Sequence, residues 1–253
     1  MTIKVKDLTN FIERLAPLNS QEDWDNSGLQ VGDKEAEVKG VLMAMDLTDQ
    51  AASQALLTGK NLIICHHPFF FQGLKSIDFS TYRGSLIKKL IDNSISVYAA
   101  HTNLDKAVGG VNHSLANIFP LKKLENISDY YEGEIGSLGE IEEVSFADFK
   151  KILDENFKDY RILGRKNESI KKIAFIGGSG AFGIKMAKEL ACDALVTADI
   201  KHHDSQLAYE LGLSLVDLGH FQSEFPALIN LKELLQEEFT DLDIDVFTDP
   251  VFF

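Results

Sequence analysis

The chain has 253 residues, of which 45% are hydrophobic and 25% are charged, and its formal net charge is −14. This composition is that of a folded globular protein and argues against extensive disorder. The negative charge argues against a broad basic groove for nucleic acid, although bound metal ions could still hold a small anion.

The first half of the sequence alternates between helical and strand periodicities, which is typical of α/β proteins. Residues 19–32 are polar and are predicted to be irregular, and Gly109-Gly110 breaks the chain before a helix. In chain order, the predicted elements are a helix over 7–15, a strand over 40–45, a helix capped by Thr48 through 57, a strand over 61–65, a helix over 82–92, a strand over 95–100 and a helix over 111–118.

The pattern loosens over residues 121–143, and a second α/β cycle follows. Its predicted elements are a helix capped by Ser145 through 157, a strand over 173–176, a helix over 183–190, a strand over 194–197, a helix over 205–211, a strand over 214–218, a helix over 223–239 and a strand over 244–248. We therefore predict two α/β lobes, the first formed by 1–124 and 216–253 and the second by 125–215.

The number of cysteines and the N-terminal sequence indicate the cellular compartment in which the protein is expected. Cys65 and Cys192 each lie in an apolar run and are predicted to be buried, inert thiols, because two cysteines make no disulfide framework. The first residues lack the apolar core of a signal peptide, and no apolar stretch is long enough to span a membrane. We expect a cytoplasmic protein.

Most of the histidines gather where predicted strands end. Loops at one edge of an open α/β sheet commonly bind ligands. Neighbouring residues in a regular strand point to opposite faces, so His66 and His67 can share a site only because Pro68 ends the strand. The two rings could then reach one centre or one metal each; an ordinary surface loop is the alternative. The six residues at strand ends are His66, His67, His101, His202, His203 and His220.

Two carboxylates accompany these histidines. Asp105 follows His101, and Glu224 lies four residues after His220, on the same face if the turn is helical. Asp105 could instead cap a helix or turn, and Glu224 could simply favour a helix N-terminus. Three imidazoles and two carboxylates are too many ligands for one open catalytic zinc and suit two bridged ions. Nitrogen and oxygen ligands favour zinc, manganese, iron, cobalt or nickel.

Four segments carry a family resemblance through the whole chain: Trp24-Asp25-Asn26-Ser27-Gly28-Leu29-Gln30-Val31-Gly32, His66-His67-Pro68, His101-Thr102-Asn103-Leu104-Asp105, and Gly219-His220 with Glu224. In this order they resemble the NIF-three-like dinuclear metal-centre family, whose members are commonly labelled GTP cyclohydrolase I type 2 homologs. The resemblance implies two α/β lobes with the metal site in the cleft between them, in a ring-shaped hexamer. It implies the ligands His66, His67, Asp105, His220 and Glu224, with Glu224 as the bridge. The chain has the length of the family's short form, which lacks an inserted domain.

A glycine-rich segment in the second lobe has three possible interpretations. Gly178-Ser179-Gly180-Ala181-Phe182-Gly183 follows a predicted strand and opens a helix, with Asp199 about twenty residues later, as in a dinucleotide-binding fingerprint. Only about three strands are expected in this lobe, which leaves little room for a dinucleotide. A tight strand-to-helix turn is therefore favoured over NAD binding, and a cradle for a substrate phosphate is the third interpretation.

The roles of the other polar and aromatic segments each have two interpretations. His101 is expected to orient a metal ligand or to act as a general acid or base. The segment Lys201–Asp204 supplies charge for an anion or is a solvated loop, and Trp24–Asn26 packs near the site or shapes the surface. Phe69–Phe71 is predicted to be core or subunit interface rather than a shelf for stacking bases.

These expectations combine into one function. We predict a metal-dependent hydrolase, cyclohydrolase-like by resemblance, that acts on a nucleotide-like or other phosphate-bearing small molecule. Glu224 and His101 are the candidate catalytic groups. A non-enzymatic metal-binding, metal-insertion or regulatory scaffold protein would need the same ligands and is the alternative.

Overall fold

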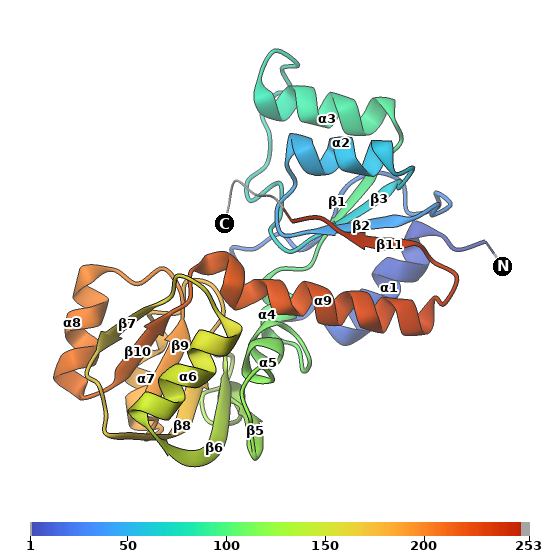
Figure 1. The fold of residues 1–253 in the computed structure, drawn as a ribbon. Coiled ribbons are helices and arrows are strands. Elements are labelled where there is room, and N and C mark those ends of the chain that lie inside the picture. Colours follow the sequence, from blue (N-terminus) through green and yellow to red (C-terminus); the bar gives the residue numbers. More distant parts are fainter. Residues whose placement is uncertain (1, 249–253) are drawn as a thin grey trace. The chain divides into compact units, whose positions relative to one another are not determined.

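The computed structural model describes residues 2–248, and within them the chain forms two compact units (Figure 1). Unit 1 runs to Val108 and resumes at Leu228, and unit 2 is Gly109–Ala227. Two α/β units with a discontinuous first unit agree with the predicted architecture. The predicted boundaries at 124/125 and 215/216 fall inside unit 2, because strands at both places pair within the unit 2 sheet.

Unit 1 is built on a mainly parallel sheet with strand order β1-β4-β3-β2-β11. Its strands are β1 (Gly28–Val31), β2 (Val41–Ala44), β3 (Leu62–Cys65), β4 (Ser96–Ala99) and β11 (Ile244–Val246). All pairings are parallel except that of β1 with β4. Strands β2, β3 and β4 are buried along their whole length, as expected for a parallel sheet covered on both faces.

Helices cover both faces of this sheet. The helices of unit 1 are α1 (Val5–Leu15), α2 (Asp49–Leu57), α3 (Tyr82–Asp92), α4 (Thr102–Lys106) and the later part of α9 (His220–Glu238), with a 3-10 turn η1 at Leu18–Ser20. Figure 1 shows α2 and α3 on one face and α1 and α9 on the other. The predicted cap is confirmed, because the Thr48 side chain accepts a hydrogen bond from the Ala51 N–H at 3.1 Å.

Unit 2 has a mixed sheet with strand order β5-β6-β8-β9-β10-β7. Its strands are β5 (Lys123–Asn126), β6 (Ser137–Ser145), β7 (Arg161–Gly164), β8 (Ser169–Phe175), β9 (Ala194–Thr197) and β10 (Ser214–Asp217). Its helices are α5 (Val111–Ala116), α6 (Phe146–Asn156), α7 (Gly183–Glu189) and α8 (His202–Leu211), with a 3-10 turn η2 at Ile127–Asp129. Strands β8, β9 and β10 are parallel, and the other three pair antiparallel.

Four strands were not predicted. Strand β1 lies in the segment expected to be irregular, and β5, β6 and β7 bring unit 2 to six strands among the described residues, where about three were expected. Strands β1, β5 and β7 are four residues long and mostly half-exposed, so they show no continuous apolar run. Strand β6 is interrupted by exposed glutamates and an irregular register.

The registers align the carboxyl ends of the parallel strands. In unit 1, Ala44 pairs with Cys65 and Cys65 pairs with Ala99. In unit 2, Thr197 pairs with Asp217. Residues that follow these strands therefore emerge together at one edge of each sheet, which is where open α/β sheets place ligand sites.

Both cysteines are buried, as predicted. Burial raises the pKa of the Cys192 thiol to about 12 and that of Cys65 even further, so neither is a thiolate near neutral pH. Among residues 2–248, no helix has the length and apolar character needed to cross a bilayer.

Candidate metal centre

Three imidazoles converge at the carboxyl edge of the unit 1 sheet. His66 and His67 follow β3, and His101 follows β4. The ring centroids lie 5.0 Å apart for His66–His67, 5.1 Å for His66–His101 and 5.6 Å for His67–His101. One ring nitrogen from each lies within 4.8 Å of the others, a spacing that a metal ion could bridge. The predicted pair is therefore joined by His101, which the sequence placed nearby in a different role.

The Nδ1 atom of each of these rings contacts an oxygen acceptor. Neither a carbonyl nor a carboxylate can donate, so each Nδ1 carries the hydrogen and each neutral ring keeps its lone pair on Nε2. Metal-binding histidines are commonly oriented in this way. The contacts are His66 Nδ1 to Ala100 O at 2.8 Å, His67 Nδ1 to Asp46 Oδ1 at 2.9 Å and His101 Nδ1 to Asp25 Oδ1 at 2.8 Å.

Asp105 lies beside this cluster in α4. Its Oδ1 is 3.6 Å from His66 Nε2, and its side chain is only 15% exposed. A lone pair on Nε2 that faces a carboxylate oxygen is repulsive unless a proton or a metal cation lies with them. The geometry of this pair is therefore compatible with a divalent ion.

Asp25 organises the loops around the imidazoles. Its side chain is fully buried and accepts hydrogen bonds from His101 Nδ1, from the N–H and hydroxyl of Thr102, from the Ser27 hydroxyl and from the Asn26 N–H. Burial raises the pKa of Asp25, but the hydrogen bonds from His101 and Thr102 outweigh it and hold the pKa well below its usual range. Asp25 is therefore a carboxylate that fixes the orientation of His101.

His220 and Glu224 form a second group in unit 2. Helix α9 begins at His220, so the two side chains share one face, as the spacing predicted. His220 Nε2 lies 3.1 Å from Glu224 Oε2, and His220 Nδ1 lies 2.7 Å from Asp199 Oδ2. The orientation matches that of His66, with Nδ1 held by an acceptor and Nε2 facing a carboxylate. Glu224 is only 5% exposed.

The glycine-rich turn packs directly against Glu224. Gly178 has φ +61°, and a Cβ added there would lie 2.2 Å from Glu224 Oε1 and 3.4 Å from His220 Cε1. The Gly178 N–H donates to the Ser223 hydroxyl at 2.9 Å, and Ser223 immediately precedes Glu224. Glycine at this position thus provides the space that the carboxylate occupies.

The other glycine N–H groups of this turn are also used within the protein. They stabilise the strand-to-helix turn, which supports the tight-turn interpretation. The donors and acceptors are Gly177 N to Asn112 Oδ1 at 2.8 Å, Gly180 N to Thr197 Oγ1 at 3.0 Å and Gly183 N to Gly180 O at 3.0 Å.

The segment Lys201–Asp204 has a local structural role. The Lys201 N–H donates to Asp204 Oδ2 at 3.0 Å, and this interaction begins α8. His202 and His203 are exposed and lie edge-to-face with ring centroids 5.5 Å apart. These contacts support the alternative of a solvated polar segment.

Sequence reasoning missed that three carboxylates, those of Asp25, Asp46 and Asp199, orient the histidines. Asp46 and Asp199 each lie two residues beyond a parallel strand, so an acidic residue directly after a strand was the available signal. Asp25 comes from an irregular segment before β1 and carried no such signal. Its role depends on a contact with a residue far away in the sequence.

Comparisons with known proteins place the chain in a family. A family model described as Duf34/NIF3 (NGG1p interacting factor 3) matches residues 3–250. A Clostridium perfringens protein named GTP cyclohydrolase 1 type 2 homolog is 37% identical over 250 residues, which cover 96% of this chain and 94% of that protein. A Helicobacter pylori protein named GTP cyclohydrolase 1 type 2 is 32% identical over 252 residues, which cover 98% of each.

The fold is shared with a solved structure. The crystal structure of Staphylococcus aureus hypothetical protein SA1388 matches with a TM-score of 0.88 and 31% identity, covering 98% of this chain and 97% of that one. Because the family model matches nearly the whole chain, this protein belongs to the Duf34/NIF3 family.

Proposed function

We propose that the protein binds two divalent metal ions with His66, His67, Asp105, His220 and Glu224 and uses them to hydrolyse a nucleotide-like small molecule. The observation that carries the proposal is the orientation of the three imidazoles. In His66, His67 and His220 an oxygen acceptor holds Nδ1, which is the common orientation of metal-binding histidines, and Nε2 is the proposed ligand atom.

The donor set fits such ions. It consists of imidazole nitrogens and carboxylate oxygens, which suit zinc, manganese, iron, cobalt or nickel. Glu224 is buried beside His220 and has two oxygens, so it is the proposed bridge between the ions. Bound divalent ions would lower the pKa of a coordinated water and polarise the group under attack.

His101 is the proposed proton-transfer group. Burial lowers the pKa of His101, and the hydrogen bond to Asp25 offsets this only in part, so the ring is neutral near pH 7. Its Nδ1 hydrogen is held by Asp25, and Nε2 can therefore accept a proton. The Asp25 carboxylate would then stabilise the imidazolium that forms.

The substrate class rests on charge and on the names of relatives. Two relatives carry the name GTP cyclohydrolase 1 type 2, with or without "homolog", which supports a purine nucleotide or a related compound. A chain of net charge −14 repels a free phosphate, so the anionic part of the substrate would need the metal ions.

Metal content and turnover test the proposal together. We expect close to two divalent ions per chain by elemental analysis, with a sharp fall in His66→Ala and His220→Ala. Reconstituted protein should turn over a member of a nucleotide panel, and Glu224→Gln should abolish that turnover. His202→Ala is the matched control, because this histidine is exposed and begins α8.

Two results would count against this function. A stoichiometry of one ion or fewer under saturating metal would contradict the dinuclear centre. Two bound ions with no turnover of any nucleotide would instead favour the non-enzymatic metal-binding, metal-insertion or scaffold role.

We also propose that the protein assembles as a toroidal homohexamer, as the family resemblance implies. Light scattering at micromolar concentration should then give six times the 28.2 kDa mass of one chain. A mass near that of one chain would contradict the ring.

A further inference from the structure

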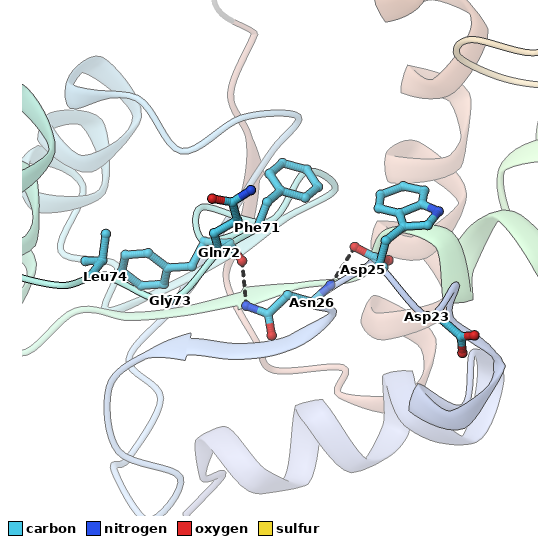
Figure 2. Close-up of a pocket in the computed structure, with 9 residues that line it drawn as sticks. Asp23, Asp25, Asn26, Phe71, Gln72, Gly73 and Leu74 are labelled. Carbon is cyan, nitrogen blue, oxygen red and sulfur yellow. Dashed lines mark hydrogen bonds between the residues drawn. The ribbon is translucent and has the colours of Figure 1, made fainter.

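A hollow lies beside the imidazole cluster, between the loop before β1 and the loop after β3. Its volume is about 560 Å³, within the range of small-molecule sites. Figure 2 shows the side chains that line it, with Asn26 and Asp25 on one loop and Phe71 and Gln72 on the other. All nine lining residues belong to unit 1: Asp23, Trp24, Asp25, Asn26, Phe70, Phe71, Gln72, Gly73 and Leu74.

Two aromatic side chains of this hollow are exposed to water. Trp24 is 61% exposed and Phe71 is 46% exposed. Their rings are nearly parallel, with centroids 6.4 Å apart and an interplanar angle of 28°. Both rings meet His101 edge-on, at 5.8 Å for Trp24 and 5.7 Å for Phe71. The exposed pair therefore stands next to the proposed proton-transfer group.

The aromatic run at 69–71 is only partly core. Phe69 is 8% exposed and lies in the hydrophobic core, and Phe70 packs against that core, as predicted. Phe71 points instead toward the hollow. Its exposure of 46% excludes the predicted core environment for Phe71.

The loops that carry these rings are tied together. The Asn26 amide donates to the Phe70 carbonyl at 2.6 Å (Figure 2). Gln30 bridges the same loops, because its Oε1 accepts from the Phe70 N–H at 3.1 Å and its Nε2 donates to the Asn26 carbonyl at 2.7 Å. The exposed rings are thus held by a hydrogen-bonded frame, which lowers the entropy cost of binding between them.

The lining also limits what can bind. Of the nine described residues around the hollow, none is basic and two are acidic. The Asp25 carboxylate already accepts hydrogen bonds from five donors, and Asn26 and Gln72 contribute amide groups to the lining. An anion is therefore disfavoured, whereas an uncharged planar ring could stack on the aromatic faces and hydrogen-bond to an amide.

We propose that this hollow is a subsite for a planar heteroaromatic ring of the nucleobase class, which stacks on Trp24 and Phe71. The subsite would form part of the substrate site of the proposed function. The identification of the ring as part of the substrate rests on that proposed function. The anionic part of the same molecule would extend toward the metal ligands. Ring binding itself needs no metal, and this separates its test from that of the hydrolase.

The chain contains one tryptophan, so its fluorescence reports on Trp24 alone. We expect inosine, an uncharged purine nucleoside, to quench this fluorescence saturably in metal-free full-length protein. Ribose 5-phosphate, which has no heteroaromatic ring, should leave it unchanged. Phe71→Ala should weaken inosine binding about 10-fold, since removal of one stacking ring commonly has an effect of this size.

Phe79→Ala is the matched control, because Phe79 is 56% exposed but lies outside the hollow. This variant should bind inosine like the unsubstituted protein. Equal effects of inosine and ribose 5-phosphate, or unchanged affinity in Phe71→Ala, would overturn the proposal. So would a Phe71→Ala protein that loses its assembly in light scattering, since the ring would then be a subunit contact. A failed inosine titration with intact metal content and turnover would remove the subsite and leave the hydrolase standing.

Discussion

Gly178→Ala is expected to lower both the stability of the protein and its metal content. A residue with a side chain at φ +61° costs about 1–3 kcal/mol. The new methyl group would also lie 2.2 Å from Glu224 Oε1, so the carboxylate must move away from His220. We expect thermal unfolding at a lower temperature and the loss of at least one metal ion per chain.

Gly133→Ala separates the two effects of the Gly178 substitution. Gly133 has φ +81°, but no atom lies within 4 Å of the position that its Cβ would take. The Gly133→Ala variant should therefore have the same kind of backbone strain as Gly178→Ala but retain its metal ions. If elemental analysis finds the same metal content in both variants, Gly178 does not act through Glu224.

Asp25→Asn is expected to destabilise the protein by about 2–3 kcal/mol, because an amide NH₂ would replace an acceptor among buried donors. The Thr102 N–H and the Asn26 N–H can only donate, and the His101 ring could accept from the amide only by moving its hydrogen from Nδ1 to Nε2. Denaturant unfolding measures the change. In reconstituted protein, the pH profile of turnover should also shift, because His101 loses the carboxylate that stabilises its protonated form.

Asp23→Asn is the control for this second substitution. Asp23 is exposed two residues away, and its replacement should change the free energy of unfolding by less than about 0.5 kcal/mol. Similar destabilisation by both variants would point to general electrostatics in an acidic chain instead of the hydrogen bonds of Asp25.

The sequence predicted the buried parallel strands well. Strands such as Leu62–Cys65 are continuous apolar runs bounded by polar residues, and caps such as Thr48 and Ser145 act within three residues of themselves. Strands β1, β5 and β7 could not be found in this way, since they are short and half-exposed. Their pairing with a neighbouring strand stabilises them, and periodicity does not report that pairing.

In the candidate site, too, local sequence predicts some contacts and long-range packing determines the others. His66 with His67, and His220 with Glu224, could be grouped from local spacing, because a strand end and one helical turn determine where they lie. The alignment of His101 with His66 depends on the register between β3 and β4. The contact between Asp25 and His101 depends on the packing of an irregular loop, for which no periodic pattern exists.

The discontinuous unit 1 has a consequence for synthesis on the ribosome. Unit 2 is one continuous stretch of chain and can fold as soon as it emerges. Strand β2, by contrast, receives its edge partner β11 only after about 200 further residues have been synthesised. During that interval the nascent protein exposes an open, apolar strand edge, which is a template for aggregation. The synthesis of β11 thus sets the moment at which unit 1 can complete its sheet.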